Sequence, residues 1–356
     1  MRIDNPFHEG EIQVQERAGE FDEGARNGRV LADSIMKGAL KFVAQQAMVV
    51  LGSVDDEQGV WASVLFGPPG FVTAPDERRV EFDLSRAGVN EHDSFWKNIE
   101  HNPRIGALFL ELATRRRLRI NGTVARPTFD RLTLDVAECY PNCPKYIQRR
   151  HIQFEAVERS ETVPPAIDGN SLKREQAELV QTSDTFFVAS AHPHRGVDAS
   201  HRGGPPGFVE VVDERTLRIP DYVGNSMFNT LGNFTVNPRA GLVFLDFKRN
   251  RTLQLTGRAK IRWDQEDASG RTGGTQRFWV FKVDRWRETQ THAGLRWEFL
   301  DYSPHNPKLK STTDDHSARG DEEKHFICPL CEGVESNEPG DCPNCSMPLC
   351  GDHAGK

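Results

Sequence analysis

Four cysteines near the C-terminus have the spacing of a metal site. They form two Cys-x-x-Cys hooks with ten residues between them, Cys328 with Cys331 and Cys342 with Cys345. Two such hooks on one short segment place four thiolates tetrahedrally around a single ion. The segment has no apolar core, so the metal would supply its folding energy. The spacing therefore predicts bound zinc, with a four-cysteine iron site as the alternative.

A second chemical signal is a set of polar residues between positions 200 and 230. Ser200–Gly203 reads Ser-His-Arg-Gly, and the loop Pro220–Asn229 supplies amide, hydroxyl and carboxylate groups before a predicted short helix. A helix N-terminus offers free backbone N–H groups and a positive dipole end to an anion. Gly224 lets the backbone approach a ligand closely. These residues predict a site for an anionic group.

The chain contains one set of motifs twice, and only the second copy keeps these polar residues. Gly-Pro-Pro-Gly-Phe-Val occurs at 67–72 and again at 204–209, and Asn-Pro-Arg occurs at 102–104 and again at 237–239. This shared order indicates a duplicated domain. The Ser-His-Arg-Gly stretch of the second copy aligns with Ser63–Phe66, which reads Ser-Val-Leu-Phe. We infer that the second copy contributes most of the ligand contacts.

Both copies have the pattern of a helix followed by short strands. The first is expected to begin with a helix over Leu31–Gln46 and a buried strand over Ala47–Val54, and the second with a helix over Leu172–Gln181. Many short strands with few helices favour antiparallel barrels over a parallel sheet. The expected fold class is mainly β: two tandem split β-barrels with short flanking helices, and a small C-terminal metal knuckle. The expected domains are an N-terminal arm (1–30), a first barrel (31–160), a second barrel (171–307), a flexible linker (308–324) and a four-cysteine metal knuckle (325–356).

The stretch Asp213–Ser226, followed by a short helix and Asn237-Pro238-Arg239-Ala240, resembles part of a known family. The chain is similar to the pyridoxamine 5′-phosphate oxidase-like FMN-binding split barrels over about residues 35–305, in two copies. This resemblance implies a flavin-dependent oxidoreductase that holds FMN at an interface between two barrels, with the phosphate at the helix start.

The helix start departs from the family pattern. The oxidases of the family have a Ser-Arg-Lys triplet there, whereas this chain has Asn225-Ser226-Met227 or, aligned from the Asn-Pro turn, Phe228-Asn229-Thr230. A cationic contact to the phosphate must then come from elsewhere, and Arg202 is the expected residue. The segment 140–149 has no counterpart in the second copy; it either folds over the flavin or forms a proline-rich turn. The candidate cofactor-binding residues are Ser200, His201, Arg202, Pro220, Asp221, Tyr222, Asn225, Ser226, Asn229 and Thr230, with Lys145 and Gln148 from that segment.

The substrate and the electron donor are not predicted, although one substrate is disfavoured. The true oxidases carry a C-terminal Arg-Leu-His-type element that holds the substrate, and Leu295–Leu300 and the residues after it lack this element. We therefore expect a small molecule other than pyridoxamine phosphate. Arg296 and Trp297 either line the flavin edge or, for Trp297, belong to the core. The alternative function is a non-enzymatic flavin-binding, haem-binding or metal-responsive protein.

The stretch Pro339–Leu349 resembles the short heavy-metal-binding domain of some metal-handling proteins, which often have His in place of Cys331. Five of the 7 cysteines lie between Cys328 and Cys350, which indicates a reducing compartment and a cytoplasmic protein. The net charge of −7 is spread without a basic block, so a nucleic-acid or anionic-membrane binder is not expected. No apolar run reaches the ~18 residues of a membrane span. The sequence does not decide whether the protein forms a homodimer.

Overall fold

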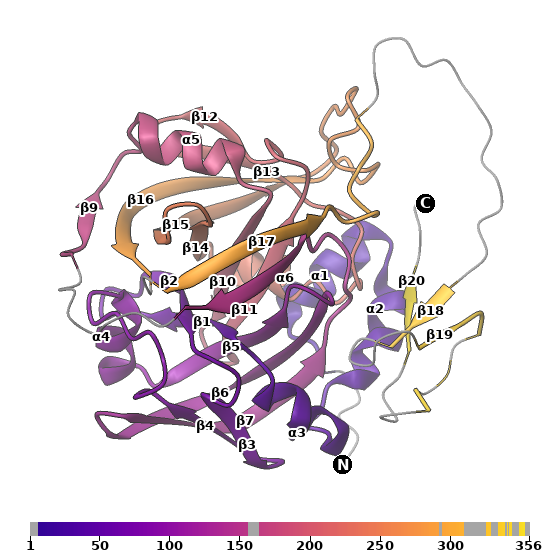
Figure 1. The fold of residues 1–356 in the computed structure, drawn as a ribbon. Helices are drawn as coiled ribbons and strands as arrows, with labels where there is room; N and C mark the ends of the chain where they lie inside the picture. The colour runs from indigo at the N-terminus through magenta and orange to yellow at the C-terminus, as the bar shows by residue number, and fades with distance from the viewer. Residues whose placement is uncertain are drawn as a thin grey trace.

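Two antiparallel sheets with the same strand order make up most of the molecule (Figure 1). The computed structural model describes residues 6–155, 164–291, 294–309, 325–328, 334–338, 340, 342–343 and 349–352. The first sheet has the order β2-β1-β5-β6-β7-β4-β3, and the second has the order β11-β10-β14-β15-β16-β13-β12, with β9 paired to β16. Each strand of one sheet therefore has a counterpart at the same place in the other.

The strands of the first sheet are β1 (Met48–Val54), β2 (Val60–Phe66), β3 (Val72–Asp76), β4 (Arg79–Asp83), β5 (Arg104–Glu111), β6 (Arg116–Thr128) and β7 (Arg131–Pro141). Those of the second are β9 (Ile167–Gly169), β10 (Thr185–His192), β11 (Gly196–Gly203), β12 (Glu210–Asp213), β13 (Thr216–Pro220), β14 (Arg239–Asp246), β15 (Arg251–Arg262) and β16 (Phe278–Gln290).

Strand β1 shows why these sequences form central strands. All seven of its residues are buried, because both faces of the sheet are covered. Val49 and Leu51 belong to the core of the first sheet, whereas Met48 and Val50 belong to a separate core that also contains residues of the second sheet. Successive side chains of a strand point to opposite faces, so an unbroken apolar run serves two cores at once.

The two sheets approach closely through glycines. Strand β5 packs against β11, and β14 packs against β2. A Cβ atom on Gly106 of β5 would lie 2.5 Å from the carbonyl oxygen of Val197, and one on Gly241 of β14 would lie 2.6 Å from the carbonyl oxygen of Val60. Backbone atoms of the facing sheet occupy this space, so a side chain at either position cannot be accommodated without moving the sheets apart.

Short helices and small sheets cover the edges. In Figure 1 helix α1 lies beside α6, with α2 next to α1, and strands β8 and β17 pair although they come from different halves of the chain. The helices are α1 (Glu9–Ala18), α2 (Phe21–Asn27), η1 (Gly28–Val30), α3 (Lys37–Ala44), α4 (Ser94–His101), α5 (Arg174–Thr182) and α6 (Asn229–Val236). The remaining strands are β8 (Arg149–Phe154), β17 (Leu295–Asp301), β18 (His325–Ile327), β19 (Glu335–Ser336) and β20 (Cys350–Asp352).

The mainly β fold class is confirmed, whereas one predicted boundary is wrong. The helix expected over Leu31–Gln46 is limited to α3, because the residues before it are extended and Ala32 pairs with Cys139 through two backbone hydrogen bonds of 2.8 and 3.0 Å. Most of the linker expected at 308–324 lies outside the described residues. Within the part of the chain that the structure describes, no helix has the length and apolar character needed to cross a membrane.

Candidate functional site

A cleft between the two halves of the chain contains nearly all the predicted cofactor residues. Its volume is about 850 Å³, part of which is open to solvent. One wall comes from β6 and the segment after β7, and the other comes from β11, the end of β13 and the start of α6. The polar and aromatic side chains that line it are those of Arg117, Arg119, Asn142, Lys145, Tyr146, Ser200, His201, Arg202, Phe208, Asp221, Tyr222, Asn225, Ser226, Phe228, Asn229 and Thr230.

Arg119 of β6 is the best-anchored cation of the cleft. Its side chain is buried, and its Nε donates to the backbone carbonyl of Ala199 at 2.9 Å. The two terminal nitrogens donate to Ser200 Oγ, to Tyr140 Oη at 2.6 Å and to Asn229 Oδ1 at 3.3 Å. Arg119 Nη1 also lies 3.4 Å from Asp198 Oδ1 of the second half, so the first half places a fixed, ion-paired cation among the polar residues of the second half.

Arg202 and His201 of β11 bring further donors. Arg202 Nη1 donates to Asp221 Oδ1 at 3.0 Å, while Arg202 Nε and His201 Nε2 are buried without a hydrogen-bond partner among the described residues. Burial and the guanidinium groups of Arg117, Arg202 and Arg150 hold the pKa of His201 well below its ordinary value, so the imidazole is neutral near pH 7. Such unpartnered buried polar atoms in a cleft are available to a ligand or to ordered water.

Helix α6 begins at the cleft without a side-chain cap. Its N-cap residue is Phe228, which adopts a left-handed backbone with φ +56° and provides no capping hydrogen bond. Thr230 and Leu231, in the first turn, line the cleft. The backbone N–H groups of an uncapped first turn and the positive end of the helix dipole favour an anion at this point.

The counterpart of this helix in the first half is capped by its own carboxylate. Asp93 is the N-cap of α4, and its Oδ1 accepts from the backbone N–H of Phe95 at 2.8 Å. The same oxygen accepts from Ser63 Oγ at 2.6 Å and from Gln254 Nε2 at 3.3 Å. Burial raises the pKa of this carboxyl. A carboxyl group of the chain itself thus occupies the helix start in the first half.

The two helix starts are built alike except at two positions. Ser63 lies on β2 as Ser200 lies on β11, and Gln254 donates to the carbonyl of Ala62 at 2.9 Å as Arg119 donates to that of Ala199. At the helix start of the second half, Phe228 therefore stands in place of the Asp93 carboxyl. The side chain that reaches this helix start from the other half is the cation Arg119, in place of the neutral amide of Gln254. The smaller cleft beside Asp93, about 410 Å³, has no lysine or arginine among its lining residues.

The predicted site residues are brought together with one exception. Lys145 and the ten candidates of the second copy all line the cleft. Gln148 does not; its amide donates to the carbonyls of Tyr146 and Gly204 and its oxygen accepts from the backbone N–H of Ser303, so it holds the chain behind the cleft. The sequence analysis missed Arg117, Arg119 and Asn142, which lie in the copy judged to have lost its site.

Trp297 and Arg296, which the sequence did not assign to one place, make their contacts outside the cleft. Trp297 of β17 packs edge-on against Phe66 and Phe247, with ring centroids 5.8 and 4.8 Å away, and is part of the core between the sheets. Arg296 pairs with Glu155 at 2.9 Å. Neither lines the cleft.

Of the four predicted metal ligands, Cys328 and Cys342 lie within the described residues and Cys331 and Cys345 lie outside them. The two described cysteines are buried and belong to the apolar cluster that includes the core of the first sheet.

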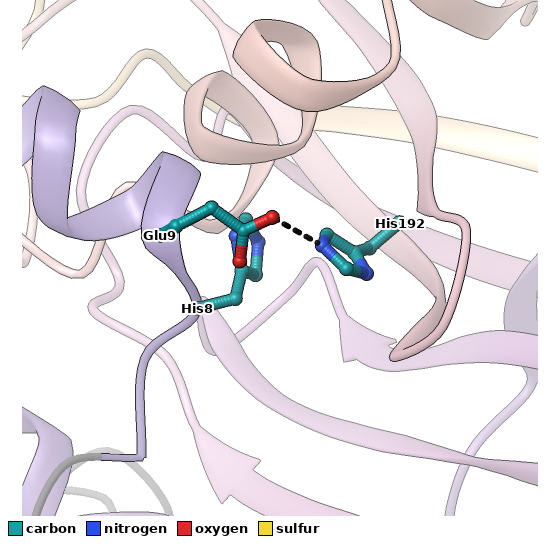
Figure 2. Close-up of side chains that lie close together, drawn as sticks. All are labelled: His8, Glu9 and His192. Atoms are coloured by element: carbon teal, nitrogen blue, oxygen red, sulfur yellow. Dashed lines mark hydrogen bonds and ion pairs between the residues drawn. The ribbon is translucent and has the colours of Figure 1, made fainter.

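A second group of possible metal ligands lies where α1 meets β10, and Figure 2 shows its side chains. The carboxylate of Glu9 and the rings of His8 and His192 approach one another, and His192 Nε2 lies 3.3 Å from Glu9 Oε1. His8 Nδ1 accepts from the backbone N–H of Gly10, and His192 Nδ1 accepts from those of His194 and Arg195, each at 3.1 Å. An Nδ1 that accepts from the backbone must be free of a proton, which leaves the ring proton on Nε2, the atom that would have to bind the metal. The group fastens the start of α1 to β10 rather than holding an ion.

Comparison with known proteins agrees with this fold. The family model of pyridoxamine 5′-phosphate oxidase matches residues 35–140 and 172–290, more than half of the chain in two tandem segments. The chain belongs to the pyridoxamine 5′-phosphate oxidase family. A comparison with curated proteins gave no match.

Several solved structures are similar to about one third of the chain. HupZ of Group A Streptococcus is 17% identical, with 32% of this chain and 91% of HupZ covered and a TM-score of 0.27. A putative pyridoxamine 5′-phosphate oxidase from Lactobacillus delbrueckii is 14% identical over 33% of this chain and 94% of that one, with a TM-score of 0.27. An FAD-binding protein from Mesorhizobium loti is 10% identical over 35% and 98%, with a TM-score of 0.25.

Proposed function

We propose that the cleft binds FMN and that the protein is a flavin-dependent oxidoreductase acting on a small molecule. The observation that carries this proposal is the carboxylate of Asp93 at the start of α4. A serine, a backbone N–H and a side-chain amide donate to that internal carboxyl in the first half. The same serine and helix start recur in the second half without a carboxyl cap and with Arg119 in place of the amide. An external phosphate satisfies that arrangement.

The residues of the cleft fit the rest of a flavin mononucleotide. Arg119, Ser200 and Thr230 would hold the phosphate, with Arg202 as a second cation. Phe208, Tyr146 and Tyr222 line the same cleft, and the two tyrosine rings lie 4.8 Å apart, which supplies flat apolar surface for an aromatic ring system. When bound, the flavin supplies one- or two-electron transfer, while the protein binds, orients and shields it.

This proposal leaves pyridoxamine phosphate out as the substrate, because no equivalent of the substrate-holding Arg-Leu-His element follows β17. Strand β17 is instead used to join the two halves through β8. The substrate is therefore a different small molecule that reaches the flavin through the open side of the cleft.

The absorption spectrum and the flavin content of the purified protein test the proposal. We expect two flavin bands that bleach with a reductant, at one flavin per chain, because only one of the two helix starts lacks a carboxyl cap. The variant Arg202→Ala with Asn229→Ala should lose at least tenfold in FMN affinity, whereas Arg258→Ala, which removes an exposed arginine of the same half, should not. A single intense Soret band, two flavins per chain, or full occupancy of the double variant would each contradict the proposal.

We also propose that the C-terminal cysteines bind one zinc ion. The variant Cys328→Ser with Cys342→Ser should lose the metal, because two of four thiolate ligands are removed. Cys143→Ser, which changes a buried cysteine beside the cleft, is the matched control and should keep the metal. Elemental analysis decides between the outcomes: equal metal content in both variants would contradict the assignment, and stoichiometric iron in the wild type would replace zinc by iron.

A further inference from the structure

The N-terminal segment 6–30 is packed tightly against the polar loop of the cleft, although the sequence suggests a simple arm. Helix α1 crosses α6 where two glycines meet: a Cβ on Gly10 would lie 2.3 Å from the carbonyl oxygen of Gly232. Helix α2 touches the loop at Gly24, where a Cβ would lie 2.7 Å from the carbonyl oxygen of Ser226. In Figure 1, α1 lies beside α6 and α2 lies next to α1. This fit holds the segment at one fixed place.

A chain of alternating charges leads from this segment to Arg202. Glu20, which precedes α2, accepts from Ser226 Oγ at 2.6 Å and lies 3.9 Å from Arg277 Nη1. Arg277 Nε donates to Asp221 Oδ2 at 2.7 Å, and Asp221 Oδ1 accepts from Arg202 at 3.0 Å. Arg277 and Asp221 are 3% and 1% exposed, so water screens this chain poorly. Glu20 therefore influences where the Arg202 guanidinium lies.

A second chain leads from the segment to Arg119. Glu11 of α1 is 5% exposed; its Oε1 accepts from Asn229 Nδ2 at 2.5 Å, and Asn229 Oδ1 accepts from Arg119 at 3.3 Å. The other carboxylate oxygen of Glu11 accepts from the backbone N–H of His8 at 2.9 Å and closes the capping box of α1. The orientation of Asn229 at the helix start is thus set by a residue of the N-terminal segment.

The Glu11 carboxyl is suited to this place because it is uncharged at neutral pH. Burial, more than any other cause, raises its pKa to about 8, and Asp198 and Glu138 add to the rise. A protonated carboxyl adds no negative charge beside a bound phosphate. The charged and titratable groups around Glu11 include Tyr140 and, in the pocket that they line together with Glu11, His8, Glu138, His192, Arg195 and Asp198.

We propose that the N-terminal segment is a structural part of the anion site, in which Glu20 and Glu11 are positioning residues that fix Arg202 and Arg119. The identity of the anion rests on the proposed function, whereas the positioning does not. Neither glutamate lies among the ligand contacts themselves, since each acts through a neighbour.

Two measurements on the full-length protein test this role. The first is the dissociation constant for FMN by fluorescence quenching, and the second is hydrogen exchange of the amides 225–233 in the ligand-free protein. Glu20→Ala should raise the dissociation constant about tenfold, which corresponds to about 1.4 kcal/mol, and should speed the exchange. Glu20→Gln keeps an acceptor for Ser226 but removes the charge, so it should give a smaller rise in the dissociation constant. The matched control is Glu16→Gln, on the exposed side of α1, and should change neither quantity.

The pH profile separates positioning from simple support of the fold. Wild-type affinity for FMN should fall as the pH rises from 7 to 9, because Glu11 ionises near the anion. Glu11→Gln imitates the protonated carboxyl, so it should match the wild type at pH 7 and show a flat profile. Equal FMN affinity and equal exchange in wild type and Glu20→Ala would overturn the positioning role. If wild type binds no FMN, the proposed function fails, and the exchange comparison still decides the positioning.

Discussion

The variant Arg119→Gln should purify without flavin, with its affinity for FMN lowered at least about 100-fold. Glutamine is the residue that the first half has at the equivalent place, where Gln254 makes the same hydrogen bond to a backbone carbonyl. The change removes the one buried cation that contacts both Ser200 and Asn229 at the start of α6. Loss of a buried, hydrogen-bonded charge partner costs about 2–5 kcal/mol, and about 2.7 kcal/mol is a factor of 100.

Two further variants make this result interpretable. Gln254→Asn changes the equivalent position of the other half and should leave flavin content unchanged. Arg119→Lys keeps the charge but loses the guanidinium geometry, so it should bind FMN more weakly than wild type and more tightly than Arg119→Gln. Circular dichroism and a thermal midpoint establish that each variant is folded. A folded Arg119→Gln that carries one flavin per chain would show that the phosphate lies elsewhere.

Replacing Gly106 or Gly241 with alanine should destabilise the protein by about 3 kcal/mol, at the upper end of the usual cost of overpacking. The added methyl group would lie 2.5 or 2.6 Å from a carbonyl oxygen of the facing sheet, and these backbone atoms cannot move aside as a flexible side chain can. Relief requires the sheets to separate, which would also widen the cleft. Urea unfolding of the ligand-free protein measures the change.

Gly224→Ala is the matched control, because no heavy atom outside its chain neighbours lies within 4 Å of a Cβ built there. Its free energy of unfolding should stay within about 0.5 kcal/mol of wild type, as for other open surface positions. If Gly106→Ala or Gly241→Ala unfolds at the same urea concentration as this control, the close contact between the sheets is wrong.

The second-half wall of the site could be predicted from sequence, whereas the first-half wall could not. His201 and Arg202 stand out because the first copy has Val64 and Leu65 in their place. That comparison treats each copy as complete in itself. Arg119 lies in the copy whose own site is lost, and its role depends on how the sheets pack, which a local pattern does not contain.

The sequence contains a signal for the capping of α4 that the comparison of the two copies did not use. Asp93 and Phe228 each stand immediately before an eight-residue helix that ends at an Asn-Pro pair. Aligned from that pair, the sequences show an acid exchanged for a phenylalanine, which indicates that a carboxyl cap is built into one copy and absent from the other. The N-terminal segment gave no such signal, because its buried residues Glu11 and Gln15 are polar and a buried helix face is expected to be apolar.

Covalent linkage of the two sheets has an evolutionary consequence. In an assembly of two identical subunits, every substitution is made in both, so a change that ruins one site ruins its symmetric twin. Here Asp93 and Gln254 differ from the residues at the equivalent positions, Phe228 and Arg119, which a symmetric assembly does not allow. A single gene encoding both halves can therefore keep one site under selection for its ligand while the other drifts into a purely architectural part.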